Sequence, residues 1–223
     1  RRVPHPVLIG HAASLSQAFF PWNATLLVRG AGASLPPAPT PFPPSLAAGG
    51  AAALANLTVR AQRGALLVAP PAAVRTLIAE GGAAVLVSPA APRLAAARVE
   101  AAAGGVLGCL PCPRAVDAQN GVPGCAAGLP ERAASNASDC PPFEVWADAL
   151  TLSDGARLLG TDVMLLAPLV RVDASSEVAT PDPAAAASSL AVRTAELILH
   201  GRARFSSVEV RRLRPRRGQA RAG

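Results

Sequence analysis

The sequence of 223 residues contains no lysine and no tyrosine, and aromatic residues make up only 3% of it. Scarce aromatics argue against an antibody-like sandwich, which uses a buried Trp and a Tyr corner, and against readers of single-stranded nucleic acid, which need stacking platforms. All 21 basic residues are Arg, which together with abundant Ala, Gly and Pro indicates the codon usage of a GC-rich genome. Any basic patch therefore presents planar donors suited to carboxylate, sulfate or phosphate.

Long hydrophobic runs are also missing. Arg, Gly and Pro interrupt every apolar stretch before it reaches 18 residues, so the sequence predicts no transmembrane span. Hydrophobic residues nevertheless make up 51% of the chain, mostly as Ala, Val and Leu. This content is sufficient for a core of small and branched aliphatic side chains.

Three of the four asparagines, Asn23, Asn56 and Asn136, stand two residues before a Thr or Ser. This clustering predicts N-glycosylation at these three positions and places the chain in the secretory pathway, outside the cell or at its surface. The sequence opens with Arg1-Arg2 and lacks a signal-peptide hydrophobic region. We therefore expect a processed protein or, preferably, a piece of a longer one.

The net charge of +7 is concentrated at one end, because residues 201 to 223 hold eight arginines and one acid. The rest of the chain is balanced, with thirteen charges of each sign. A solvated tail is the simpler interpretation of residues 211–223, and a contact with a polyanion is the functional one. The predicted polyanion-binding residues are Arg211, Arg212, Arg214, Arg216 and Arg217.

Short strand-like runs joined at glycines recur about every 18 to 22 residues, which is the length of a solenoid rung. The runs resume after a cysteine-containing segment. The alternative takes residues 46–57 and 94–103 as Ala-rich helices. The pattern predicts N-terminal strands over 1–34, a Pro-, Ala- and Gly-rich connector over 35–53, β-solenoid rungs over 54–107, a cysteine-containing insertion over 108–142, further rungs over 143–210, and a basic tail over 211–223.

The four cysteines Cys109, Cys112, Cys125 and Cys140 fall within one loop-rich segment. The spacing of Cys109 and Cys112 resembles half of a zinc ribbon or a redox pair, but no second such pair follows, so no metal site is predicted. In an oxidising compartment an even count predicts two disulfides, with three connectivities open.

No catalytic residue and no cofactor site is predicted. His5, His11 and His200 lack partners in a recognisable motif. If the chain were a carbohydrate-active enzyme, its site would draw on acids and arginines that we expect along neighbouring rungs. Solvated turn residues are the favoured interpretation of that set, which consists of Asp148, Asp154, Arg157, Asp162, Arg171 and Asp173.

The stretch 143–160, followed by 163–172 and 176–178, resembles the repeats of large glycine-rich extracellular proteins of green algae and land plants. The resemblance covers about residues 143–210, with a looser match over 54–107. It implies an all-β fold, a right-handed parallel β-helix of the pectin-lyase type, in which the cysteine segment would be a disulfide-bearing insertion. It also implies a secreted or surface location, and it carries no catalytic residues over to this chain.

The first functional hypothesis is a structural or adhesive segment of a secreted glycoprotein that contacts acidic polysaccharide or other polyanions of a cell wall or matrix. The second is a carbohydrate-active β-helix enzyme, a polysaccharide lyase or hydrolase. The third is an intracellular Arg-tailed protein that binds nucleic acid, a partner that the aromatic scarcity disfavours.

Overall fold

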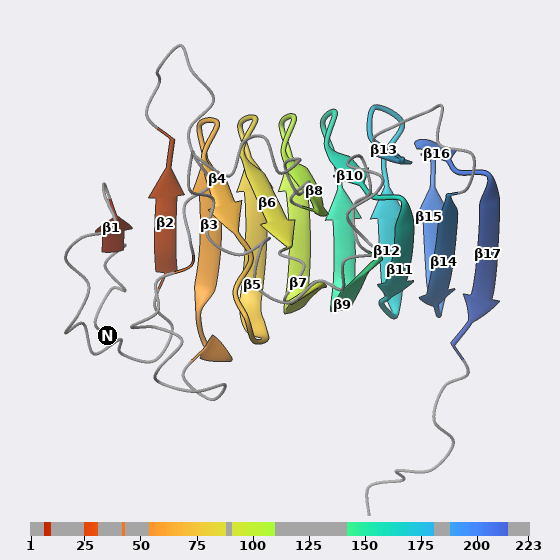
Figure 1. Cartoon of the computed structure of the whole chain (residues 1–223), viewed down its shortest axis with the longest axis horizontal. Helices are drawn as coiled ribbons and strands as arrows, with labels where there is room; N and C mark the ends of the chain where they lie inside the picture. The colour runs from red at the N-terminus through yellow and green to blue at the C-terminus, as the bar shows by residue number, and fades with distance from the viewer. Residues whose placement is uncertain are drawn as a thin grey trace, which may run out of the picture.

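The structure is a computed structural model that describes residues 7–9, 25–30, 42, 54–87, 91–109, 142–180 and 188–213. The regular elements of these residues are β-strands, and they form two sheets in which neighbouring strands pair in parallel. The strands lie side by side along the long axis of the molecule in chain order (Figure 1). The prediction of an all-β fold is therefore confirmed.

The larger sheet has eleven strands. In places two short strands lie beside one long strand. The first half of β9 pairs with β11 and its second half with β12. The strands of this sheet are β1 (Val7–Ile9), β2 (Thr25–Arg29), β3 (Thr58–Gln62), β5 (Val74–Glu80), β7 (Arg93–Ala102), β9 (Phe143–Leu152), β11 (Asp162–Leu166), β12 (Leu169–Val172), β14 (Ser189–Thr194), β15 (Glu196–Leu199) and β17 (Ser207–Arg212). The smaller sheet contains β4 (Leu66–Val68), β6 (Ala84–Val87), β8 (Val106–Cys109), β10 (Arg157–Leu159), β13 (Glu177–Ala179) and β16 (Arg202–Arg204).

In several repeats the two sheets advance by the same number of residues from strand to strand. Val59 pairs with Leu77 in the larger sheet and Leu67 pairs with Val85 in the smaller, 18 positions on in each case. The next steps are 22 positions, from β5 to β7 and from β6 to β8. The step from β9 to β12 and from β10 to β13 is 20 positions. These repeats each contribute a strand to both sheets, and their steps agree with the predicted spacing of about 18 to 22 residues. Other steps are longer, with 33 positions from β2 to β3, 27 from β12 to β15 and 25 from β13 to β16.

The core lies on one face of each sheet, where every second side chain is aliphatic. In the larger sheet one column of paired residues is at most 1% exposed, and it consists of Val59, Leu77, Val99, Leu150 and Val170. Full burial of each such side chain is worth about 1.5–3 kcal/mol. The column exists because successive repeats place an aliphatic residue at the same register position.

Tight turns lead from the larger sheet to the smaller, and they stack on one another. The N–H of Gly82 donates to the C=O of Ala103 in the next turn at 3.1 Å, and the N–H of Gly104 donates to the C=O of Asp154 at 3.0 Å. A positive φ, which glycine adopts without strain, recurs in this row. It is found at Gly64, Gly82, Gly104 and Gly155.

The helical alternative is wrong for residues 94–103, because β7 covers Arg93–Ala102 as an extended strand. Ala has a high helix propensity, but every second residue of β7 packs into the core, and this tertiary burial overrides the propensity. Residues 46–53 of the other candidate helix lie outside the described residues.

Candidate functional site

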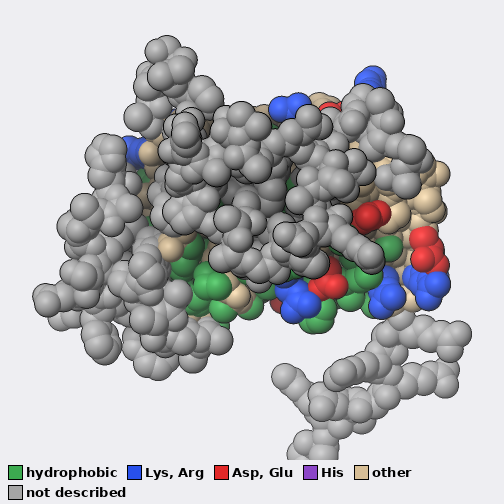
Figure 2. Space-filling model, viewed as in Figure 1, with side chains coloured by type: hydrophobic (Ala, Val, Ile, Leu, Met, Phe, Trp, Pro, Cys, Tyr) green, Lys and Arg blue, Asp and Glu red, His purple; other side chains and the backbone are tan. Residues whose placement is uncertain are grey.

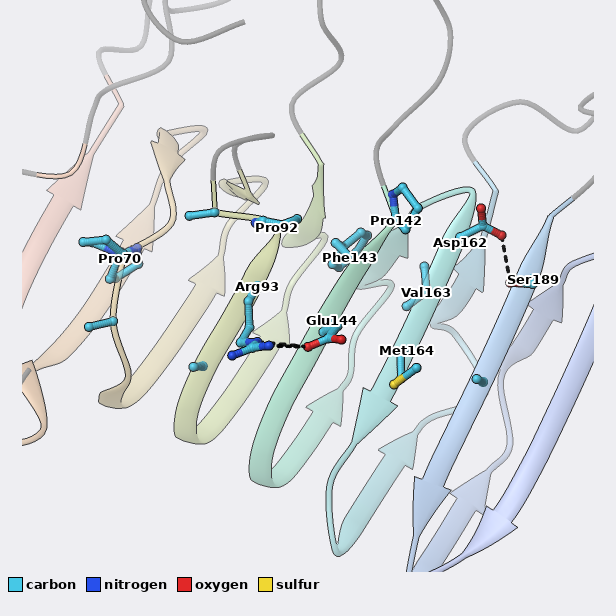
Figure 3. Close-up of a pocket in the computed structure, with 15 residues that line it drawn as sticks. Pro70, Pro92, Arg93, Pro142, Phe143, Glu144, Asp162, Val163, Met164 and Ser189 are labelled. Atoms are coloured by element: carbon cyan, nitrogen blue, oxygen red, sulfur yellow. Dashed lines mark hydrogen bonds and ion pairs between the residues drawn. The ribbon is translucent and has the colours of Figure 1, made fainter. Parts of the chain in front are cut away.

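A groove of about 450 Å³ opens on the outer side of the larger sheet, where β7, β9, β11 and β14 begin. Prolines that precede strands line it, as expected of a residue that cannot donate to a sheet ladder. Phe143 and Val163 are buried beneath it, and polar side chains from separate strands point toward it (Figure 3). These polar residues are Arg93, Glu144, Asp162 and Ser189.

Arg93 and Glu144 form the central contact of the groove. They are directly opposite each other in the parallel register of β7 and β9. The Nη2 and Nε atoms of Arg93 lie 2.8 and 3.0 Å from Oε2 of Glu144. Opposite charges at paired strand positions attract each other, and the Arg93 side chain is half exposed, so we assign the pair a positioning role rather than a large share of stability.

Trp146 adjoins the groove and completes the arrangement. Its Nε1–H donates to Oε2 of Glu144 at 2.8 Å, and the guanidinium carbon of Arg93 lies 4.2 Å from the centre of its ring. The ring is nevertheless 44% exposed. The residue opposite Trp146 in β7 is Ala95, which is small. An exposed indole is thus held by a hydrogen bond and a cation–π contact.

A second carboxylate lies farther along the groove. Asp162 is opposite Ser189 in the register of β11 and β14, and it accepts a hydrogen bond from the Ser189 hydroxyl at 2.8 Å. Glu144 is opposite Met164, two residues beyond Asp162. Glu144 and Asp162 are therefore diagonal neighbours, whose Cα atoms are roughly 7–8 Å apart in a sheet.

Gly160 supports the buried layer beneath the groove. A Cβ atom at this position would overlap Cε1 of Phe143 and would lie 2.6 Å from Cγ2 of Val163. Contacts this short require the neighbours to move, and both neighbours are packed in the core. Only glycine lets the chain before β11 pass this close to Phe143.

The predicted glycosylation sites are only partly visible. Asn56 is exposed in the turn before β3, where a glycan would find solvent. Asn23 and Asn136 lie outside the described residues. Glycosylation at the three positions stays a prediction.

Of the four cysteines, the structure describes Cys109, which is 5% exposed at the end of β8. Cys112, Cys125 and Cys140 lie outside the described residues. The two disulfides and their connectivity therefore stay predictions.

The structure describes only two of the predicted polyanion-binding residues. Arg211 and Arg212 are exposed in β17, and Arg211 pairs with Glu209 on the same strand. Arg214, Arg216 and Arg217 lie outside the described residues. On the face seen in Figure 2, basic and acidic side chains lie close to one another rather than in a field of one sign.

The acids and arginines proposed for an enzyme do not converge. Asp162 is at the groove, whereas Arg157 is in the smaller sheet and Arg171 is on β12. Asp154 and Asp173 belong to the stacked turns between the sheets. Consecutive repeats keep such residues at different positions around the repeat, so their closeness in sequence does not translate into one site.

Asp173 has a structural role in the turns. Its Oδ2 accepts the N–H of Asp154 at 2.8 Å and its Oδ1 accepts the N–H of Ser175 at 3.1 Å. The neighbouring Ser176 side chain first, and then the N–H of Asp154, lower the pKa of Asp173 from 3.8 to about 2. Asp154 has a φ of 53°, so the carboxylate caps a turn that is otherwise strained.

The groove residues Arg93, Glu144 and Trp146 were not singled out from the sequence. A signal was present in the alternation Phe-Glu-Val-Trp over 143–146, which puts Trp146 on the face opposite buried Phe143 and Val145. Arg93 gave no signal, because its partner is 51 positions away.

Within the described ranges there is no cluster of three or more His, Cys, Asp or Glu side chains suited to a metal ion. The same residues include no helix that is long and apolar enough to cross a membrane. Comparison with protein-family models, curated proteins and solved structures gives no match. The resemblance to algal and plant extracellular proteins therefore stays a prediction.

Proposed function

We propose that the chain is a structural or adhesive segment of a secreted glycoprotein, built as a right-handed parallel β-helix that presents a saccharide-binding groove. The equal steps of 18, 22 and 20 residues in both sheets support the β-helix, since a chain that coils visits each sheet once per turn. Right-handed connections are the rule between parallel strands of one sheet. In this arrangement the four cysteines staple the insertion over 108–142 to the coil through Cys109.

The observation that carries the saccharide proposal is the fixed, exposed ring of Trp146 beside the groove. Arg93 and Glu144 hold the indole in place, so little side-chain entropy is lost when a ligand packs on it. The C–H groups of a sugar ring suit an aromatic face, and its hydroxyls suit the charged and hydroxyl groups that line the groove. A groove that crosses several strands fits a chain of sugar units.

The charges of the groove indicate a neutral sugar rather than an acidic one. Arg93 contributes one positive charge, while Glu144 and Asp162 contribute two negative ones. Glu144 and Asp162 would repel the carboxylate of a uronic acid. The one arginine of the groove, Arg93, is already paired with Glu144. Contact with acidic matrix polysaccharide is instead proposed for the basic end, at Arg211, Arg212, Arg214, Arg216 and Arg217.

Calorimetric titration with neutral oligosaccharides tests the groove. We expect saturable binding by the whole chain and a loss of about tenfold in affinity, equal to about 1.4 kcal/mol, for Trp146→Ala. A second variant, Arg93→Ala, removes the cation that holds the Trp146 ring. Its matched control is Arg98→Ala, because Arg98 is an exposed arginine on the distal half of β7, where it pairs with Glu100. Equal binding by Trp146→Ala and the unmodified chain would exclude the groove.

The basic end requires its own measurement, the binding of a uronic-acid polymer at several salt concentrations. Replacement of Arg214, Arg216 and Arg217 by alanine should weaken binding and flatten its salt dependence. Unchanged binding would remove the tail from the proposal and leave the groove untouched. Binding of a single-stranded oligonucleotide in preference to both polysaccharides would instead favour the nucleic-acid hypothesis.

A glycoside hydrolase is the second candidate, because Glu144 and Asp162 share one groove. They are diagonal neighbours in the register of β9 and β11, and an inverting enzyme likewise places two carboxyl groups in one groove. However, Glu144 already accepts hydrogen bonds from Arg93 and Trp146, so structural contacts occupy its carboxylate. Release of reducing ends that is abolished in both Glu144→Gln and Asp162→Asn would establish this alternative.

A further inference from the structure

The outer face of the larger sheet continues beyond the groove as a row of paired residues. Trp146 on β9 is opposite Leu166 on β11, and Leu166 is opposite Arg193 on β14. Arg193 in turn is opposite Arg211 on β17. Side chains at paired positions share one face of a sheet, so the row leads from the exposed indole to two neighbouring arginines. It crosses the strands along the long axis of the molecule (Figure 1).

Arg193 is the cation of this row that has no acid beside it. Its side chain is exposed, and its two paired neighbours are Leu166 and Arg211. The ion pairs of the described residues do not include Arg193, whereas Arg211 donates from Nε to Glu209 on its own strand. Like charges at paired strand positions repel each other, so an anion bound at Arg193 would relieve this repulsion.

The spacing of the row suits an extended sugar chain. Neighbouring strands are about 4.8 Å apart, close to the length of one unit in an extended polysaccharide. Trp146 and Arg193 are two strands apart, so their Cα atoms are roughly 10 Å from each other. The surface between them is apolar and partly exposed, with Leu166 in the row and Met164 beside it. A sugar chain that crosses the strands can therefore contact the indole with one unit and Arg193 with a later one.

The sign of the charge changes along this path. Glu144 and Asp162 line the groove near the indole, and Arg193 follows farther on. On the face seen in Figure 2, basic side chains reach the surface near β14 and β17. A ligand with an anion on every unit, such as a nucleic acid or a polyuronate, would meet the two carboxylates. A polysaccharide that combines neutral and acidic units avoids this repulsion and still supplies an anion to Arg193.

We propose that the groove and the outer face of β11 and β14 form one elongated site for a polysaccharide with both neutral and acidic units. A neutral unit packs on Trp146, and the carboxylate or sulfate of a later unit pairs with Arg193, whose planar guanidinium suits bidentate binding of such groups. Arg193 is then a specificity-determining residue of the saccharide site. The inference rests on the saccharide-binding function proposed for the groove.

Calorimetric titration of the whole chain with matched probes tests the elongated site. The probes are a neutral cello-oligosaccharide and the same oligosaccharide with one carboxylate or one sulfate, placed at either end in turn. At least one acidic probe should bind about tenfold more tightly than the neutral one, and this ratio should fall as the salt concentration rises. Equal affinities for neutral and acidic probes would overturn the inference and leave the groove intact. Absence of binding by every probe would overturn the proposed function as well.

Arg193→Ala locates the acidic contact, and it should bring the ratio of acidic to neutral affinity close to one. Its matched control is Arg171→Ala, which removes an exposed arginine of the same sheet whose paired neighbours are Thr151 and Ile198. The control should keep the ratio of the unmodified chain. A ratio that survives in Arg193→Ala, or that falls equally in both variants, would contradict the assignment. Tighter binding of a single-stranded oligonucleotide than of any saccharide would contradict it too.

Discussion

Leu152 and Leu199 occupy the same core column, one strand apart on either side of Val172, and they differ completely in exposure. Leu152 has a paired strand on both sides and is 0% exposed, whereas Leu199 has a partner on one side and is 44% exposed. In a stack of repeats each repeat contacts only its neighbours, so burial depends on having two of them rather than on residue type. Stability should therefore concentrate in the middle of the sheets.

The largest expected effect tests this comparison directly. Leu152→Ala leaves a cavity between two repeats and should lower the free energy of unfolding by about 2–5 kcal/mol. Leu199→Ala removes the same atoms from a partly solvated site and should cost about 1 kcal/mol or less. Urea denaturation of both variants measures the difference. Similar losses would mean that the C-terminal strands are as well covered as the middle.

The next effect concerns two glycines that differ in what surrounds them. Gly160→Ala forces a Cβ atom against Phe143 and Val163 and should cost about 1–3 kcal/mol through overpacking. Gly155 has a φ of 76° with no atom within 4 Å of its Cβ position, so Gly155→Ala should cost only about 1 kcal/mol of backbone strain. A greater loss at Gly155 than at Gly160 in thermal unfolding would contradict the packing described beneath the groove.

A smaller effect distinguishes the carboxylate of Asp173, whose pKa is lowered from 3.8 to about 2. A lowered pKa in the folded state contributes stability above pH 3.8 that is lost as the pH falls toward 2. Because hydrogen bonds to a charged group are screened near the surface, Asp173→Asn should cost only about 1 kcal/mol at pH 7. The gap between the two proteins should close between pH 4 and 2, roughly. A gap that is constant over this pH range would exclude the carboxylate as its cause.

The smallest effect on stability is expected at the groove. The Arg93 side chain is half exposed, so Arg93→Ala should change the free energy of unfolding by less than about 1 kcal/mol. The same substitution should release Trp146 and increase its mobility, detectable as lower fluorescence anisotropy of the indole. A large loss in the free energy of unfolding, with unchanged fluorescence anisotropy of Trp146, would contradict this assignment. It would mean that Arg93 stabilises the sheets rather than positions the indole.

Much of the fold could be predicted from the sequence, because one repeat contains its own signals. Glycines at 64, 81–82 and 104–105 marked the turns, and aliphatic residues at alternate positions marked the strands. The order of the strands followed from the recurrence of this pattern about every 18 to 22 residues over part of the chain. Residues 94–103 showed the limit of propensity, since their alanines suit a helix in isolation and a strand in this stack.

The candidate site could not be predicted in the same way. Arg93 meets Glu144 across a segment of 51 residues, and only the register of β7 on β9 brings them together. The acids near residues 148–173 looked like a cluster because they are close in sequence, yet Asp162 and Asp173 take opposite ends of a repeat. The register of neighbouring strands decides which side chains meet. That register depends on the lengths of the intervening segments, which no local sequence pattern indicates.

The most direct measurement of the central claim is the fluorescence of Trp146 during saccharide titration. The chain has two tryptophans, so Trp22→Phe leaves Trp146 as the only reporter. We predict that a neutral oligosaccharide shifts the Trp146 emission to shorter wavelength, saturably, and that the shift disappears in Arg93→Ala. Saccharide binding that leaves the Trp146 emission unchanged, or no binding at all, would contradict the groove as the functional site.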